Sequence, residues 1–297
     1  MIDTKCGFIA VVGRPNAGKS SLLNFLVNER LALVSHKQNA TRKRQNIIVM
    51  HKENQLIFVD TPGIHEREKL LNQFMLEEVM KSLGDCDIVV FLAPITDDLS
   101  HYEKFLELNR DNKPHIVLLT KVDFVKNEDV LEKLHEYSKY SDKFLEIIPF
   151  TIKKDNQKVR DNLFETISKY LPKSPFLYDP EFLTTSNIRE IYKELIRESI
   201  FENLSDELPY ESDVIIDKIF EDDRLDKVYA TIVVERDNQK GMMIGKNGET
   251  IKRVGKHARE SMEDFAHKKI YLDLKVVIKQ GWTKTKKSLG ELGYSMD

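Results

Sequence analysis

A glycine-rich segment near the N-terminus has the composition of a phosphate-binding loop. It reads Gly13-Arg14-Pro15-Asn16-Ala17-Gly18-Lys19-Ser20 and follows the apolar run Phe8–Val12. Glycines let the backbone curl so that successive N–H groups face a phosphate, while a lysine adds positive charge and a hydroxyl suits Mg²⁺. We therefore expect Lys19 to contact the β- and γ-phosphates of a nucleotide and Ser20 to bind the metal. The motif alone does not separate ATP from GTP.

A second motif, Asp60-Thr61-Pro62-Gly63, comes directly after the apolar run Leu56–Val59. A carboxylate at the end of a strand can hold Mg²⁺, and a glycine three residues later can bring its N–H to the γ-phosphate. Taken alone, this tetrapeptide is a common turn. Its place behind a phosphate-binding loop favours the functional interpretation.

The tetrapeptide Thr120-Lys121-Val122-Asp123 indicates which base is bound. It ends the apolar run Ile116–Leu119. The Asp123 carboxylate can accept hydrogen bonds from N1–H and the N2 amine of guanine, and adenine offers no such pair of donors. An unpaired acceptor in the site disfavours a rejected analogue on the order of 10⁴-fold. The expected nucleotides are therefore GTP and GDP, with the stem of Lys121 along the base plane.

Over the first 170 residues, short apolar runs alternate with longer amphipathic stretches, which predicts a mostly parallel sheet covered on both faces by helices. The segment Met50–Leu56 indicates a tight turn between two strands, so one antiparallel edge strand is expected. The predicted strands are Phe8–Val12, Ile47–His51, Gln55–Val59, Ile88–Ala93, Ile116–Thr120 and Phe144–Phe150. The predicted helices are Ser20–Val27, Leu70–Leu83, Glu103–Asn109, Asp129–Tyr137 and Val159–Tyr170.

The C-terminal part predicts a smaller domain in the order helix, two strands, helix, strand, helix. Its elements are Ile188–Leu204, Asp213–Phe220, Lys227–Glu235, Glu249–Phe265, Ile270–Lys279 and a short basic helix. Before it, the proline-containing run after Leu171 has no clear periodicity and is interpreted as a linker. We expect domains at 1–172 and 187–297, with the linker at 173–186.

Within this smaller domain, Ile244-Gly245-Lys246-Asn247-Gly248 is expected between an apolar strand and a basic amphipathic helix. That is the setting of the GXXG loop of a KH domain, in which glycines let a nucleic-acid backbone approach closely. Lys246, Lys252, Arg253 and Lys256 would meet phosphates, and Ile244 and Ile251 would line the groove for the bases. Trp282 could stack on a base or lie in the core, and Met242 and Met243 are expected in the core.

Charge is distributed unevenly along the 297 residues, whose formal net charge is −3. From Arg189 to Asp226 there are five Lys and Arg against thirteen Asp and Glu, or −8. From Arg236 to Lys287 there are fourteen against six, or +8. The basic block beside the glycine-rich turn is the electrostatic footprint expected of a nucleic-acid-binding surface.

The three nucleotide motifs, in this order and spacing, resemble those of P-loop GTPases, and the C-terminal half narrows the resemblance to the Era family of bacterial GTPases. The resemblance covers nearly the whole chain. It implies an α/β fold, namely a doubly wound P-loop GTPase sheet followed by a type II KH domain. It also implies a switch segment at 35–47, in which Thr41 reaches Mg²⁺ and the γ-phosphate, and a base-contacting loop at Thr151.

The resemblance assigns residues to four sets. Nucleotide contacts are expected from Gly13, Arg14, Pro15, Asn16, Ala17, Gly18, Lys19, Ser20, Ser21, Asp60, Thr61, Pro62, Gly63, Ile64, Thr120, Lys121, Val122, Asp123, Thr151 and Ile152. The metal would be held by Ser20, Thr41 and Asp60, and catalysis would involve Lys19, Thr41, Gly63 and Asn16. RNA contacts are expected from Ile244, Gly245, Lys246, Asn247, Gly248, Ile251, Lys252, Arg253 and Lys256.

Several positions depart from the family pattern. Thr120 stands where an asparagine is usual, Thr151-Ile152 replaces a Ser-Ala pair, and Ala40-Thr41 replaces two threonines. The first two changes bear on how tightly the base is bound and not on which base it is, because Asp123 is intact. The third is mild, because Thr41 is kept. Ile64 stands where many GTPases have a water-orienting glutamine, so intrinsic hydrolysis is expected to be slow, ~10⁻⁴ to 10⁻³ s⁻¹. Asn16 matches the position at which relatives help to hold K⁺.

The implied partners are the 3′ end of 16S rRNA and the 30S ribosomal subunit, and the implied function is assistance in assembly of that subunit by a monomer. The alternative is a membrane-associated regulatory GTPase that couples nucleotide state to growth control, with the basic block on anionic lipid. Two distant cysteines, no signal peptide and no stretch of membrane-spanning length predict a cytoplasmic protein. They are also compatible with peripheral contact at the cytoplasmic face of the membrane.

Overall fold

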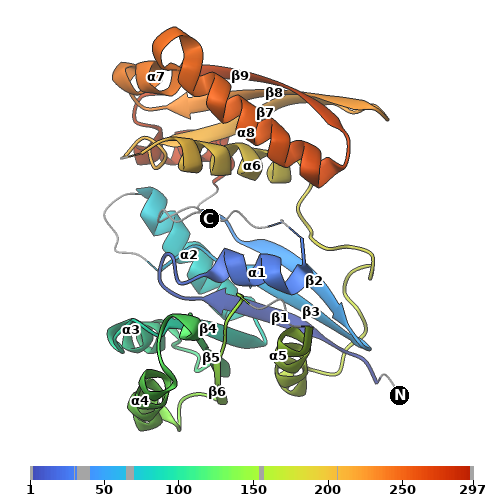
Figure 1. Ribbon diagram of the computed structural model, residues 1–297, viewed down its shortest axis with the longest axis vertical. Helices are drawn as coiled ribbons and strands as arrows, with labels where there is room; N and C mark the ends of the chain where they lie inside the picture. Colours follow the sequence, from blue (N-terminus) through green and yellow to red (C-terminus); the bar gives the residue numbers. More distant parts are fainter. Residues whose placement is uncertain are drawn as a thin grey trace. The chain divides into compact units, whose positions relative to one another are not determined.

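The computed structural model describes residues 3–29, 31, 41–64, 70–153, 157–205 and 207–294. The chain divides into two compact units (Figure 1). The first is built mainly from residues up to Thr185, and the second mainly from Ser186 onward.

The first unit is a sheet of six strands in the order β2-β3-β1-β4-β5-β6. Neighbouring strands run parallel except for the antiparallel pair β2–β3, so the predicted mostly parallel α/β sheet and its hairpin are confirmed. The strands are β1 (Lys5–Val12), β2 (Gln45–His51), β3 (Asn54–Asp60), β4 (Ile88–Pro94), β5 (His115–Thr120) and β6 (Glu146–Pro149). The helices are α1 (Lys19–Val27), α2 (Leu70–Asp85), α3 (Ser100–Leu108), α4 (Asn127–Tyr137) and α5 (Gln157–Tyr170).

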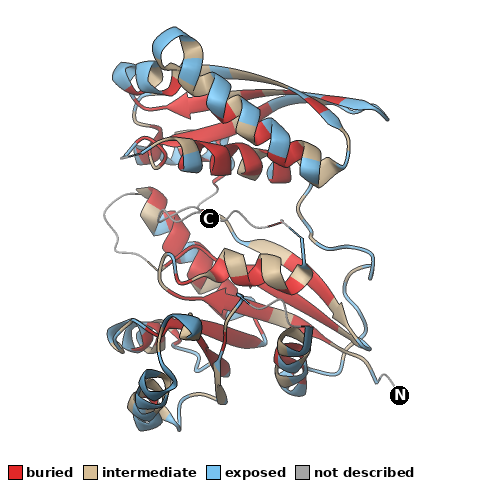
Figure 2. Ribbon diagram, viewed as in Figure 1, coloured by how far each residue is buried: buried red, intermediate tan, exposed pale blue. Residues whose placement is uncertain are grey.

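The central strands of this sheet are buried on both faces (Figure 2). Every residue of β4 and β5 is buried, and both strands are rich in Ile, Val and Leu. Such continuous apolar strands are stable only when helices cover both faces of the sheet. The core therefore fixes the sheet rigidly, and the residues that follow its strands inherit a defined position.

The predicted linker is held against the first unit along most of its length. Lys173 forms a β-bridge with Lys5, and Thr184 forms one with Ile47 on the edge strand β2. The backbone N–H of Ile48 donates to the carbonyl of Leu183 at 2.8 Å. These contacts cover the open edge of β2, which would otherwise present unpaired backbone groups.

A buried glutamine anchors the middle of this segment. The Gln55 side chain on β3 is fully buried, and its Oε1 accepts from the backbone N–H groups of Leu177 and Tyr178 at 2.9 and 3.0 Å. Its Nε2 donates to the Tyr178 carbonyl at 2.8 Å. One side chain thus satisfies three backbone groups of a segment without regular structure.

We predict that Gln55→Leu releases this segment, because it removes three hydrogen bonds that each contribute about 0.5–1.5 kcal/mol. Chymotrypsin should then cleave after Phe176, Tyr178 or Phe182 about tenfold faster or more, since cleavage follows the population of the open form. Gln157→Leu, at an exposed position on α5, is the matched control. Equal cleavage rates in both variants and the wild type would contradict the anchoring role.

The second unit has a three-stranded sheet, in the order β7-β8-β9, on which helices pack. β7 and β8 are antiparallel, and β8 and β9 are parallel. The elements are α6 (Ile188–Asn203), β7 (Ser212–Phe220), β8 (Leu225–Val234), α7 (Asp237–Ile244), α8 (Glu249–Ala266), β9 (Lys269–Ile278) and α9 (Lys286–Glu291).

The predicted element order of this unit lacks one helix. The segment before Gly245 is the short helix α7, not a strand leading directly into the glycine-rich turn. Gly241 is a poor helix former inside α7, and the segment carries no apolar periodicity, so the sequence pattern contains no helical signal. Tertiary packing stabilises it instead, because Met243 is fully buried in the core of the unit. Among the described helices of both units, none is long and apolar enough to span a membrane.

Candidate functional site

The three nucleotide motifs meet along one edge of the six-stranded sheet. β1, β3, β4 and β5 are parallel, with Val11 opposite Asp60 and Pro94 opposite Thr120. The carboxyl ends of parallel strands lie at the same edge, where open α/β sheets place their ligands. The segments after Val12, Val59 and Leu119 are therefore brought together as predicted.

The loop from Gly13 to Ser20 curls tightly between β1 and α1. Gly18 has a φ of 102° and Asn16 a φ of 59°, both in the left-handed region. At Gly13 a Cβ would lie 3.0 Å from the Leu92 carbonyl oxygen, so the loop approaches the backbone of β4 closely. These conformations turn the loop around the N-terminus of α1, the position where backbone N–H groups can bind an anion.

Lys19 is a buried cation inside this loop. Its Nζ donates to the carbonyls of Gly13 and Arg14 at 3.2 and 3.1 Å. Burial lowers the pKa of Lys19 to about 8, while the negative charge of Asp60 opposes that change. A phosphate in the loop would stabilise the charged form, as expected of a phosphate-contacting lysine.

Three oxygen atoms converge beside Lys19. Ser20 Oγ lies 3.2 Å from both Thr41 Oγ1 and Asp60 Oδ2, and Thr41 Oγ1 donates to the same carboxylate oxygen at 3.3 Å. Two hydroxyls and a carboxylate are hard ligands of the kind that Mg²⁺ takes. Within the described ranges no cluster of three or more His, Cys, Asp or Glu side chains is arranged for a metal. The mixed oxygen set therefore fits the predicted magnesium site.

The Asp60–Gly63 segment is seated against the phosphate-binding loop. The hydroxyl of Thr61 donates to the Val11 carbonyl at 2.6 Å, and the Ile64 N–H donates to the Gly13 carbonyl at 3.3 Å. A Cβ on Gly63 would lie 2.8 Å from the backbone nitrogen of Pro15. Only glycine allows this approach, which holds the backbone of Gly63 beside the loop.

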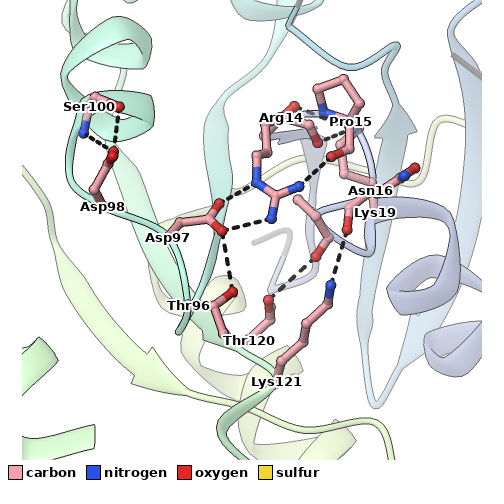
Figure 3. Close-up of polar contacts among 12 residues, drawn as sticks. Arg14, Pro15, Asn16, Lys19, Thr96, Asp97, Asp98, Ser100, Thr120 and Lys121 are labelled. Atoms are coloured by element: carbon pink, nitrogen blue, oxygen red, sulfur yellow. Dashed lines mark hydrogen bonds and ion pairs between the residues drawn. The ribbon is translucent and has the colours of Figure 1, made fainter. Parts of the chain in front are cut away.

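The predicted base-binding residues lie together at the end of β5. Thr151 Oγ1 donates to Asp123 Oδ1 at 2.7 Å, so the loop after β6 reaches the base-selecting carboxylate. Lys121 Nζ donates to the Asn16 carbonyl at 3.2 Å (Figure 3). Thr120 Oγ1 donates to the Ala17 carbonyl at 3.4 Å, so its hydroxyl also connects this segment to the phosphate-binding loop.

The GXXG turn of the second unit is built between α7 and α8. Gly245 and Gly248 have φ values of 74° and 75°, and Asn247 has a φ of 51°. A Cβ on Gly245 would lie 2.2 Å from the hydroxyl of Thr250, so only glycine fits there. The side chains of Lys246, Asn247, Lys252, Arg253 and Lys256 are exposed, and those of Ile244 and Ile251 are partly exposed.

The family comparisons agree with both halves of this geometry. The model of the 50S ribosome-binding GTPase family matches residues 8–121, and that of the KH domain matches residues 195–283. GTPase Era of Campylobacter concisus is 53% identical over 291 residues, covering 98% of this chain and 100% of the relative. GTPase Era of Helicobacter pylori strain G27 is 52% identical over 99% of this chain and 98% of the relative. The chain belongs to the Era family of GTPases.

Two solved Era structures share its fold over both units, each with a TM-score of 0.92 and 31% identity. One is an Aquifex aeolicus Era variant bound to GDP and AlF₄⁻, with 98% of this chain and 100% of that chain covered. The other is Era with MgGDPNP and nucleotides 1506–1542 of 16S ribosomal RNA, with 99% and 100% covered. An Era-type GTPase domain followed by a KH domain is thus the architecture of this chain.

The structure decides whether three apolar residues of the second unit are buried or exposed. Met242, expected in the core, is 59% exposed just before the GXXG turn, whereas Met243 is buried as expected. The sequence allows Trp282 either to stack on a base or to pack in the core. It is fully buried, and its Nε1 donates to the Glu211 carbonyl at 3.2 Å. Trp282 is therefore a core residue.

Some basic side chains near the two sites bond to other residues of the protein, and others are exposed to solvent. Arg253 donates from Nε to Asn203 Oδ1 at 3.1 Å and from its guanidinium to the Asn203 carbonyl at 3.0 Å. In the switch segment Arg42 is buried, whereas Arg44 is exposed and contacts the exposed Asp85 at 2.8 Å. Residues 35–40 of that segment lie outside the described residues.

Lys153, which the sequence interpretation missed, lies at the base-selecting carboxylate. Its Nζ is 2.8 Å from Asp123 Oδ2 and 3.9 Å from the centre of the Phe124 ring. This ion pair lowers the pKa of Asp123, with the Thr151 hydrogen bond adding to the effect. The only signal in the sequence was its position two residues after Thr151.

Asp97, the second missed residue, lies at the phosphate-binding loop. The guanidinium of Arg14 is bidentate on its carboxylate, through Nε on Oδ2 and through a second nitrogen on Oδ1 at 2.7 Å (Figure 3). A third nitrogen of Arg14 donates to the Pro15 carbonyl at 2.8 Å. The side chain of Arg14 thus fixes the loop to the segment after β4 and points toward Asp97.

We predict that Asp97→Asn weakens GDP binding about tenfold, because a charge-assisted bidentate contact contributes about 1.5–3 kcal/mol and here fixes the loop. Isothermal titration with GDP measures the effect. Asp98→Asn is the matched control, since Asp98 accepts hydrogen bonds from Ser100 on α3 and, among the described residues, makes none with the loop. If both variants bind GDP as tightly as the wild type, the positioning role of Arg14 and Asp97 is excluded.

Proposed function

We propose that this Era-family GTPase is a switch that binds the 3′ end of 16S rRNA and assists assembly of the 30S ribosomal subunit. The observation that carries the proposal is the GXXG turn, whose two left-handed glycines lie among exposed lysines in a chain with a guanine-nucleotide site. The Era structure that contains nucleotides 1506–1542 of 16S rRNA supports this choice of RNA.

The nucleotide site has the groups needed to bind and hydrolyse GTP. In this proposal Lys19 contacts the β- and γ-phosphates, and Gly63 offers its N–H to the γ-phosphate. Ser20, Thr41 and Asp60 hold Mg²⁺, which neutralises phosphate charge when bound. Asp123 selects guanine, with Thr151 orienting its carboxylate. Cleavage of the bond to the γ-phosphate by water gives GDP and phosphate.

Intrinsic hydrolysis is expected to be slow, because the apolar side chain of Ile64 cannot orient the attacking water. Ile64 packs partly buried against the core of the first unit. We propose that K⁺ beside Asn16 supplies positive charge in place of an arginine finger, since Asn16 is exposed in a left-handed turn of the phosphate-binding loop. Turnover should be several-fold higher in K⁺ than in Na⁺ buffer, and equal turnover would exclude the ion from this role.

In the second unit, Lys246, Lys252 and Lys256 are proposed to contact phosphates, with Ile244 and Ile251 against bases. All three lysines are exposed around the turn, and Lys256 makes only a weak contact with Glu260 at 3.8 Å. Arg253 would have to leave Asn203 or bind a phosphate from its present position. Such contacts make RNA affinity fall as salt rises.

The proposal is tested by the affinity of the full chain for a single-stranded 16S rRNA 3′-end oligonucleotide, with GDPNP or GDP bound. Binding should be tighter with GDPNP. The double variant Lys246→Asp, Asn247→Asp should lose binding, because two carboxylates in the turn repel phosphates. Lys104→Asp, at an exposed lysine on α3 of the first unit, controls for the loss of a distant positive charge. RNA binding that is equal in both nucleotide states and unaffected by the turn variant would refute the proposal.

Peripheral membrane association is the competing proposal, and its support is the basic block of the second unit. Sedimentation with vesicles of anionic lipid at moderate salt distinguishes the two. A monomeric cytoplasmic protein bound to RNA should remain in the supernatant.

A further inference from the structure

The sheet of the second unit has one face covered by helices and one face largely open. Val228, Ala230 and Ile232 of β8 point into the core, where they pack with α6 and α8. Because side chains alternate along a strand, Lys227, Tyr229 and Thr231 lie on the opposite face. We call this opposite side of β7, β8 and β9 the outer face. Figure 2 shows exposed residues at the free end of these strands.

Three aromatic side chains form a cluster across the outer face. The rings of Phe220 on β7 and Tyr229 on β8 are 6.0 Å apart, and those of Tyr229 and Tyr271 on β9 are 6.1 Å apart. Phe220 is 56% exposed and Tyr271 is 50% exposed. Aromatic rings with so large an exposed fraction, on three adjacent strands, contribute little to the packing of the hydrophobic core.

Lysines alternate with these rings in a pattern fixed by strand register. Lys227 is paired with Phe220 on one side and with Tyr271 on the other, and Lys218 is paired with Tyr229. One row across the sheet therefore consists of Phe220, Lys227 and Tyr271. In the next row on the same face, Lys218 lies beside Tyr229. Successive rows on one face are about 7 Å apart, since a strand rises about 3.4 Å per residue.

The lysines of the outer face are available for a ligand. Lys218, Lys227 and Lys275 are exposed, and among the described residues none of them makes a hydrogen bond or ion pair with the protein. Asp273 and Asp217 lie among them, and Asp217 accepts a hydrogen bond from Thr231 at 2.7 Å. Lys269 is also on this face, so the strands carry four lysines there against Asp217 and Asp273, while the turn after Phe220 adds the acidic residues 221–223 at one end.

This combination points to a polyanion with flat apolar groups. Single-stranded nucleic acid is recognised by aromatic rings on which bases stack and by cations along its backbone. A second copy of this chain is disfavoured, because a symmetric contact would oppose lysine-rich faces. We propose that the outer face of the β7-β8-β9 sheet is a second binding surface for single-stranded RNA, with bases on Phe220, Tyr229 and Tyr271.

This surface is separate from the GXXG turn and goes beyond the function proposed above. The turn lies between α7 and α8, whose Met243 and Val254 pack on the inner face of the sheet. The two surfaces are thus on opposite sides of one sheet. RNA long enough to reach both surfaces would bind more tightly than a short segment at the GXXG turn alone. Once one surface is occupied, the other meets the same RNA at a high effective concentration.

The test uses the full chain and two oligouridine probes. One has about four nucleotides, the span that a GXXG loop clamps, and the other about sixteen. The double variant Phe220→Ala, Tyr271→Ala should raise the Kd for the long probe about tenfold or more and leave the Kd for the short probe unchanged. Tyr271→Phe keeps a ring and should bind like the wild type. Phe182→Ala, at an equally exposed phenylalanine of the first unit (56%), is the matched control.

The proposal is overturned if the double variant binds the long probe like the wild type, or loses both probes equally. A shift toward monomer in sedimentation without loss of long RNA also overturns it, in favour of self-association. If the double variant does not fold, photocrosslinking of the wild type to 5-iodouridine RNA decides. Crosslinks at Tyr229 or Tyr271 support the surface, and crosslinks confined to residues 244–256 overturn it. Failure of the GXXG proposal is seen separately, as no binding of the short probe.

Discussion

The carboxyl ends of parallel strands in one sheet lie along one edge, and the nucleotide site of this protein depends on that constraint. Gly13, Asp60 and Thr120 are far apart in the chain, yet the pairing of β1 with β3 and β4, and of β4 with β5, leaves them side by side. The strands are buried on both faces, so their positions do not depend on a ligand. Phosphate, metal and base contacts are arranged on a rigid support.

The loops on that edge are fixed to one another by a small number of close contacts. Gly63 lies against Pro15, and Arg14 grips Asp97, so two loops are held to the phosphate-binding loop from different strands. Thr120 and Lys121, at the end of β5, donate hydrogen bonds to carbonyls of the phosphate-binding loop. These segments therefore contact the phosphate-binding loop directly from three strands. Such tightly packed neighbours are the physical basis on which a switch can act.

The sequence predicts this fold well where spacing and apolar patterns are strong. Every predicted strand of the first unit corresponds to an observed strand, because continuous apolar runs before Gly13, Asp60 and Thr120 leave little alternative. Helix α7 was missed because Gly241 is a poor helix former in a segment without apolar periodicity. Asp97 and Lys153 were missed because their partners are chosen by tertiary contact. The anchoring of the linker by Gln55 could not be predicted for the same reason, since Gln55 lies 122 residues before Leu177 and no local pattern connects the two.

The central claim is that the nucleotide site and the RNA-binding turn form one switch, and thermodynamic linkage gives its most direct test. If GDPNP tightens RNA binding, RNA must tighten GDPNP binding by the same factor. The measurement is the Kd of GDPNP with and without a saturating 16S rRNA 3′-end oligonucleotide, with GDP measured in parallel. We expect RNA to lower the Kd of GDPNP, relative to that of GDP, by about 5- to 150-fold. Equal Kd values with and without RNA for both nucleotides would contradict it.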